Sequence, residues 1–149
     1  MNIPKHSKSG ELPEGEFKVS LEKIRASFGD GNPTRKKLML GLEQACENFK
    51  NAGVKNIWIN GSFITTKEQP NDIDGCWEYS DRVNLNRLDP VFLMESRIPM
   101  KEKYGLEFFP ACFIEGDTGV PFPKFFQTNR NGEAKGILIV NLGGKNDYE

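Results

Sequence analysis

The pattern of hydrophobic and polar positions predicts a long helix in the first half of the chain. Over residues 33–52, apolar side chains recur at steps of three and four, which gives a helix one apolar face. That face consists of Leu38, Leu42, Ala45, Phe49 and Ala52. Asn32 is a favourable N-cap, Pro33 suits the first helical position, and Gly53 supplies a stop. A shorter helix is expected over residues 20–29.

Apolar runs bounded by turn residues predict four strands, at residues 55–60, 72–78, 106–109 and 135–142. Further pieces are expected to be short: a helical turn at 63–66, helices after Asp89–Pro90 and at 122–128, and a loop or irregular helix at 95–103, which Pro99 interrupts. Residues 1–16 are rich in Pro, Gly, Lys and Glu and are expected to be an extended N-terminal segment, with residues 17–149 as one domain. This order predicts an α/β (α+β) fold, a small mixed β-sheet with helices packed mainly on one face.

The candidate functional residues lie at the end of the first predicted strand and at the start of the second. Asp72 and Asp74 flank Ile73, so strand alternation places both acids on one face and Ile73 on the other. Two neighbouring carboxylates repel each other, and a divalent cation with a preference for oxygen ligands, such as Mg²⁺, offsets that repulsion. The Gly61–Ser62 corner suits phosphate, because glycine lets backbone N–H groups approach closely and serine adds a hydroxyl donor.

The series Asn60-Gly61-Ser62, spacer, Asp72-Ile73-Asp74 resembles the signature of the nucleotidyltransferase superfamily of the DNA polymerase beta type. Asn60 departs from that signature, which prefers an apolar residue there. The superfamily carries a third acid on a later strand, and Leu106-Glu107-Phe108 has the matching form. Glu107 is therefore the predicted third acid, with Asp81 and Asp89 as alternatives in turn-like contexts.

The chain also resembles a family of small bacterial and phage proteins described as nucleotidyltransferase-like. The resemblance covers nearly the whole chain, in five segments: Ile3-Pro4 to Gly15, GSFITTKEQPNDIDGCW, Leu88-Asp89-Pro90, KYGLEFFPA and FFQTNRNGEAKGILIVNL.

These resemblances imply a nucleotidyltransferase-like fold and a transferase that uses two Mg²⁺ ions, or Mn²⁺, held by Asp72, Asp74 and Glu107. A nucleoside triphosphate such as ATP would rest on Gly61 and Ser62, and its nucleotide would pass to a hydroxyl of an RNA, a protein or a small molecule. Minimal members of the superfamily often belong to toxin–antitoxin or phage-defence pairs, which implies a cognate partner protein or a homodimer. Several cations are candidates for contact with the triphosphate or acceptor: Lys67 first, then Lys101, Lys103, Lys124 and Arg130.

Two other functions remain open. The fold could serve as a catalytically inactive binding module, an antitoxin or a nucleotide sensor. The same acids could instead serve a phosphohydrolase or nuclease, but the extra His and Asp ligands common in such enzymes are missing. A calcium loop of the EF-hand type does not fit, because Pro70 stands where an early ligand belongs and the far end lacks Glu.

Composition narrows the classes of protein to which the chain can belong. The chain has 149 residues, a net charge of −1, and neither a membrane-length apolar run nor the apolar core of a signal peptide, which predicts a cytoplasmic protein without membrane contact. Its three cysteines lack metal spacing and predict no disulfide framework, with Cys76 and Cys112 expected in the core. A single histidine, His6, disfavours His-dependent catalysis. Core packing is also the expected role of three aromatic residues that could otherwise stack on a base: Phe63, Trp77 and Tyr104.

Overall fold

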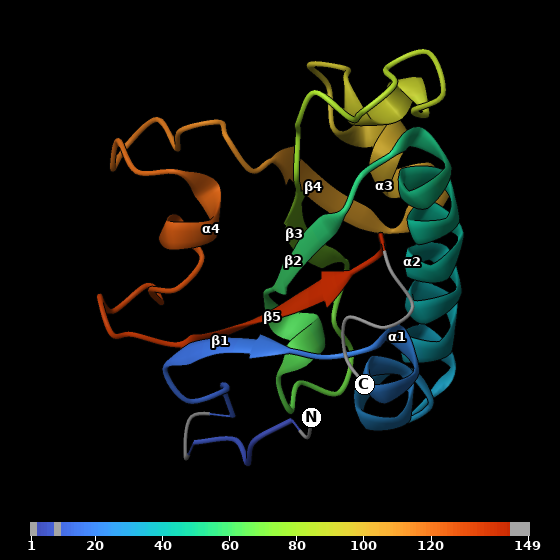
Figure 1. Ribbon diagram of the computed structural model, residues 1–149. Helices are drawn as coiled ribbons and strands as arrows, with labels where there is room; N and C mark the ends of the chain where they lie inside the picture. Colours follow the sequence, from blue (N-terminus) through green and yellow to red (C-terminus); the bar gives the residue numbers. More distant parts are fainter. Residues whose placement is uncertain (1–2, 8–9, 144–149) are drawn as a thin grey trace.

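The structure is a computed structural model that describes residues 3–7 and 10–143. Within these ranges the chain forms a five-stranded mixed sheet with helices on both sides (Figure 1). In spatial order the strands are β1 (Gly15–Lys18), β5 (Gly136–Asn141), β2 (Asn56–Asn60), β3 (Ile73–Trp77) and β4 (Leu106–Pro110). The α/β class predicted from the sequence is confirmed.

The strand pairing is parallel at the two edges of the sheet and antiparallel in its centre. β1 runs parallel to β5 and β3 runs parallel to β4, whereas β2 is antiparallel to both of its neighbours. In this register Asn60 of β2 faces Asp74 of β3, and Asp74 in turn faces Glu107 of β4. A row of three polar residues therefore crosses one end of the sheet.

Three helices cover one face of the sheet (Figure 1). They are α1 (Leu21–Ile24), which continues into a π-helical turn at Arg25–Gly29, α2 (Pro33–Ala52) and α3 (Ile98–Tyr104). The core lies between α2 and the sheet, where the Phe49 ring stacks at 6.2 Å from Trp77 and 6.0 Å from Phe108. Phe63 and Tyr104 are buried as well, so the predicted core role of these aromatic residues is confirmed.

The opposite face is covered only in part. There, α4 (Phe122–Phe125) packs through Phe122 on Phe109 of β4, with the ring centroids 4.3 Å apart (Figure 1). Two single 3₁₀ turns complete the elements, η2 (Ser62–Ile64) after β2 and η3 (Pro90–Phe92) before α3. None of the helices among the described residues is long and apolar enough to cross a membrane.

The predicted ends of α2 are confirmed. The Asn32 side chain accepts a hydrogen bond from the Arg35 N–H at 2.9 Å, and Pro33 begins the helix, where a missing N–H costs nothing. Gly53 ends it in the left-handed region at φ 93°, which glycine adopts without strain.

Three features differ from the sequence predictions. β1 begins at Gly15, before the boundary expected between residues 16 and 17, because pairing with β5 gives this short segment its hydrogen bonds. Residues 98–104 form the regular helix α3, since Pro99 occupies its first turn, where proline is tolerated. Cys76 is buried as expected, but the prediction for Cys112 is wrong: it lies exposed beyond the end of β4.

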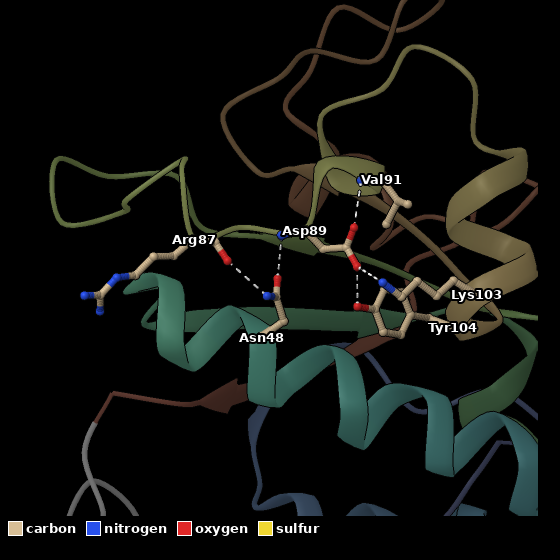
Figure 2. A network of polar contacts seen from close by, with 6 residues as sticks. All are labelled: Asn48, Arg87, Asp89, Val91, Lys103 and Tyr104. Carbon is tan, nitrogen blue, oxygen red and sulfur yellow. Dashed lines mark hydrogen bonds and ion pairs between the residues drawn. The ribbon is translucent and has the colours of Figure 1, made fainter.

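A polar network ties the 84–92 loop to α2 and α3 (Figure 2). The Asn48 amide donates to the Arg87 carbonyl at 3.1 Å and accepts from the Asp89 N–H at 2.8 Å. The Asp89 carboxylate accepts from Tyr104 Oη at 2.6 Å and from Lys103 Nζ. Burial opposes the ionisation of Asp89, but the hydrogen bonds from Lys103 and Tyr104 hold its pKa below the usual value. Asp89 is thus engaged in fixing this loop.

Candidate metal and phosphate site

Three acids from two strands meet at one end of the sheet. One carboxylate oxygen from each of Asp72, Asp74 and Glu107 lies within 4.8 Å of the other two. Asp74 and Glu107 face each other across β3 and β4, and Asp72 immediately precedes β3. All three side chains are half-buried. The structure therefore brings together the acids that the sequence singled out.

The apolar neighbours of the acids explain this arrangement. Ile73, Leu106 and Phe108 are fully buried or nearly so, at 0%, 0% and 1% exposure, on the helix-covered side of the sheet. Alternation along each strand then turns Asp72, Asp74 and Glu107 toward the opposite face. The burial of the apolar residues holds the acids together against their mutual repulsion.

The Gly61–Ser62 corner lies directly against these acids. Gly61 has φ 84° and ψ −167°, and a Cβ at this position would overlap the carboxylate of Asp74. A glycine is required here, both for the backbone angles and for the close approach. Gly61 occupies the N-cap position of η2. The corner thus brings the Gly61 backbone directly beside the Asp74 carboxylate.

Arg35, which the sequence analysis did not identify, fixes the segment that follows the corner. Its guanidinium is buried, with 6% exposure, and donates to the carbonyls of Phe28 at 3.1 Å, Phe63 at 2.7 Å, Thr65 at 3.0 Å and Lys67 at 2.5 Å. Burial lowers its pKa below the usual value. Because one side chain of α2 satisfies four carbonyls, the loop from η2 to Lys67 is pinned to the helix.

Two cations, Lys101 of α3 and Arg97 at the N-cap of this helix, pair with the acids. Lys101 Nζ lies 3.2 Å from Asp72 Oδ2 and 3.0 Å from Glu107 Oε2, and Arg97 Nε lies 3.4 Å from Glu107 Oε1. Hydrogen bonds to Glu107 and Asp72 raise the pKa of Lys101. Lys101 was a candidate from sequence, whereas Arg97 was missed, since only the docking of α3 brings it near.

Asp74 has the most perturbed environment of the cluster. Burial, together with repulsion from Asp72 and Glu107, raises its pKa to about 7, and the attraction of Lys101 offsets only part of that effect. At neutral pH without metal, Asp74 is therefore protonated part of the time. A bound cation favours the charged carboxylate and would displace that proton.

The remaining candidate cations differ in where they lie relative to the three acids. Lys135, just before β5, is half-buried; burial lowers its pKa, and attraction to Glu11 and Asp74 opposes this. Lys67 is exposed, with its carbonyl bonded to Arg35, on the wall of a hollow that also includes His6. The other predicted cations lie elsewhere: Lys103 in the Asp89 network, and Lys124 and Arg130 exposed on or after α4. Lys135, which the sequence analysis missed, is thus within electrostatic reach of Asp74.

The donor set fits a small divalent cation. Three carboxylate oxygens within reach of a single ion are the hard ligands that Mg²⁺ and Mn²⁺ prefer.

The chain belongs to DUF6932, a family of unknown function, whose family model matches residues 4–141. No curated protein and no solved structure matches the chain.

Proposed function

We propose that this DUF6932 protein is a Mg²⁺-dependent nucleotidyltransferase that moves a nucleoside monophosphate from a nucleoside triphosphate to a hydroxyl of an RNA or protein acceptor. The observation that carries the proposal is the meeting of the Asp72, Asp74 and Glu107 carboxylates within 4.8 Å, directly against the Gly61–Ser62 corner. Acids alone would suit many metal sites. The glycine backbone beside them favours phosphate chemistry, because backbone N–H groups at such a corner can bind phosphate oxygens.

Each residue has a proposed role in the transfer. Asp72 and Asp74 would hold both metal ions and Glu107 the ion on the acceptor side, and the ions would acidify the acceptor hydroxyl and neutralise the triphosphate. The backbone of Gly61 and the hydroxyl of Ser62 would bind phosphate oxygens. The acceptor oxygen attacks the α-phosphorus in line, the bond to the β-phosphate oxygen breaks, and pyrophosphate leaves. Glu107 would accept the hydroxyl proton.

Lys135 takes the role in triphosphate binding that the sequence analysis gave to Lys67. Its ammonium lies within electrostatic reach of Asp74, where β5 begins, whereas the Lys67 segment is held toward α2 by Arg35. A half-buried lysine near Asp74 would bind phosphate oxygens as a point charge.

A second candidate function has its own observation. Lys101 and Arg97 already pair with Asp72 and Glu107, and these ion pairs neutralise the acids without any metal. An inactive binding module, such as an antitoxin or a nucleotide sensor, would use the site in this closed form. In either case the proposed partners are those of a toxin–antitoxin or phage-defence pair, a cognate protein or a second copy.

Transfer of labelled nucleotide tests the proposal. The protein is incubated with Mg²⁺ or Mn²⁺, with each nucleoside triphosphate labelled at the α- or γ-phosphate, and with cell extract as the source of acceptors. We expect α-label, but not γ-label, on an RNA or protein band, and its loss in Asp74→Asn and Glu107→Gln. Asp117→Asn, an exposed loop carboxylate, is the matched control. No transfer with any nucleotide, or equal transfer by Asp74→Asn, contradicts the proposal.

A further inference from the structure

Asn60 carries a buried oxygen without a partner. Its residue exposure is 4%, and Oδ1 has no hydrogen-bond donor among the described residues. Buried polar atoms in native proteins are almost always paired, so an exception calls for an explanation. An amide oxygen can be satisfied only by a donor or a cation.

The strand register places this side chain at the acid cluster. Asn60 is the last residue of β2 and faces Asp74 across the antiparallel pair, and Asp74 faces Glu107 on β4. Side chains directly opposite each other project from the same face of a sheet. Ile59, the preceding residue, is fully buried among the core residues, so Asn60 turns the other way. Asn60, Asp74 and Glu107 thus form one row on one face.

The position of Asn60 in the chain strengthens the argument. It immediately precedes Gly61, whose backbone lies against the Asp74 carboxylate. An apolar side chain would fill this buried position without leaving a polar atom unpaired. The amide therefore indicates that this chain uses the oxygen for something that an apolar residue could not do.

We propose that Asn60 Oδ1 is a further oxygen ligand of the divalent cation held by Asp72, Asp74 and Glu107. The inference rests on the metal site of the proposed function. A neutral amide oxygen is a ligand that hard cations accept, and it adds a donor to the site without adding negative charge. This suits a cluster in which three carboxylates already lie within 4.8 Å of one another.

The test measures Mn²⁺ binding by electron paramagnetic resonance, together with thermal unfolding of the metal-free protein. Asn60→Leu keeps the branched shape of the side chain and removes the oxygen. We expect its Mn²⁺ affinity to fall at least tenfold, while the metal-free protein unfolds at the same or a higher temperature, because the unpaired oxygen is gone. A purely structural role for the amide predicts the opposite pair of results, lower stability and unchanged affinity.

Two further variants keep the test decisive. Asn56→Leu is the matched control on the same strand and face, where the amide bonds to Glu78 at 3.2 Å, and we expect unchanged Mn²⁺ affinity. Asn60→Asp keeps an oxygen at the same place and should bind Mn²⁺ at least as tightly as the wild type, even if Asn60→Leu does not fold. Wild-type affinity in Asn60→Leu, tenfold weaker binding in Asn60→Asp, or absence of Mn²⁺ binding by the wild type overturns the inference. Nucleotide transfer by the wild type, measured separately, decides the proposed function.

Discussion

The backbone of Gly61 lies against the carboxylate of Asp74, so closely that any side chain at position 61 would overlap Asp74 Oδ2. Two segments separated by a loop are thus in contact at the point where the candidate metal ligands and the candidate phosphate corner meet. Because of this contact, the position of the Gly61–Ser62 corner and the position of the Asp74 carboxylate depend on each other. A change in the corner is therefore expected to disturb the metal ligands.

Gly61→Ala tests that dependence. The substitution forces a side chain into φ 84°, ψ −167°, and against Asp74. We expect a loss of about 1–3 kcal/mol in the free energy of unfolding, from the strained backbone. We also expect at least tenfold weaker Mn²⁺ binding. Urea unfolding and a Mn²⁺ titration measure the two effects. Gly116→Ala, where an added Cβ meets nothing within 4 Å, serves as the control. Equal metal affinity in both variants would show that the contact is irrelevant to the site.

Arg35→Met tests the anchor of the loop after the corner. The variant leaves the carbonyls of Phe28, Phe63, Thr65 and Lys67 without their buried donor. We expect a loss of about 2–4 kcal/mol in the free energy of unfolding, because unpaired buried acceptors are costly. Chemical denaturation gives the value. Lys36→Met, an exposed neighbour on α2, should stay close to the wild type. A loss no larger than in Lys36→Met contradicts this role.

The raised pKa of Asp74 predicts a pH effect with a definite sign. Its pKa is about 7 in the folded protein and 3.8 as the reference value, so between these pH values the folded state binds more protons than the unfolded state. Stability from this group therefore falls as pH rises from about 4 to about 7, by at most about 1.4 kcal/mol per pH unit, and then levels off. Urea unfolding in EDTA across this range measures the slope.

Asp74→Asn should remove the contribution of Asp74 to the pH dependence of the free energy of unfolding. Saturating Mg²⁺ should remove the same contribution from the wild type, because a bound ion favours the charged form of the Asp74 carboxylate. If the wild type and Asp74→Asn keep parallel stability profiles in EDTA, the environment assigned to Asp74 is incorrect.

Lys101→Met tests competition between α3 and the metal. Lys101 bridges Asp72 and Glu107 but is itself 45% exposed, so it can leave when a cation binds. Without this competitor we expect Mn²⁺ to bind about tenfold more tightly in the absence of nucleotide. The metal-free protein should lose no more than about 1 kcal/mol of stability, since the ion pairs are partly exposed. Lys124→Met on α4 is the control, and tighter binding in both variants would point to net charge alone.

Asp89 offers a contrast with Glu107. Asp89→Asn weakens the charge-assisted bonds from Lys103 and Tyr104 that hold the loop in Figure 2. We expect about 1–3 kcal/mol lower stability with unchanged Mn²⁺ affinity. Glu107→Gln should show the reverse, weaker metal binding with little loss of stability, because it removes a cluster charge. Metal binding that depends on Asp89 and not on Glu107 would reassign the third acid.

Local pattern and resemblance together were sufficient for the acid cluster but not for its surroundings. Strand alternation grouped Asp72 with Asp74, whereas Glu107 was predicted as the third acid from the resemblance to the nucleotidyltransferase signature, with its apolar neighbours in support. Arg97, Lys101 and Lys135 come near them only through the docking of α3 and the placement of β5, which no short-range spacing encodes. In the same way, β1 is hidden by its glycine- and proline-rich surroundings and exists because β5 pairs with it.

The central claim is that Asp72, Asp74, Glu107 and the Gly61–Ser62 corner form one metal-dependent nucleotide site. Calorimetric titration with a non-hydrolysable nucleoside triphosphate, in Mg²⁺ and in EDTA, tests it without knowledge of the acceptor. We predict binding in Mg²⁺ that EDTA abolishes and that Asp72→Asn/Asp74→Asn loses, while Asp117→Asn retains it. Binding that is equal in EDTA, or equal in the double variant, would contradict the claim.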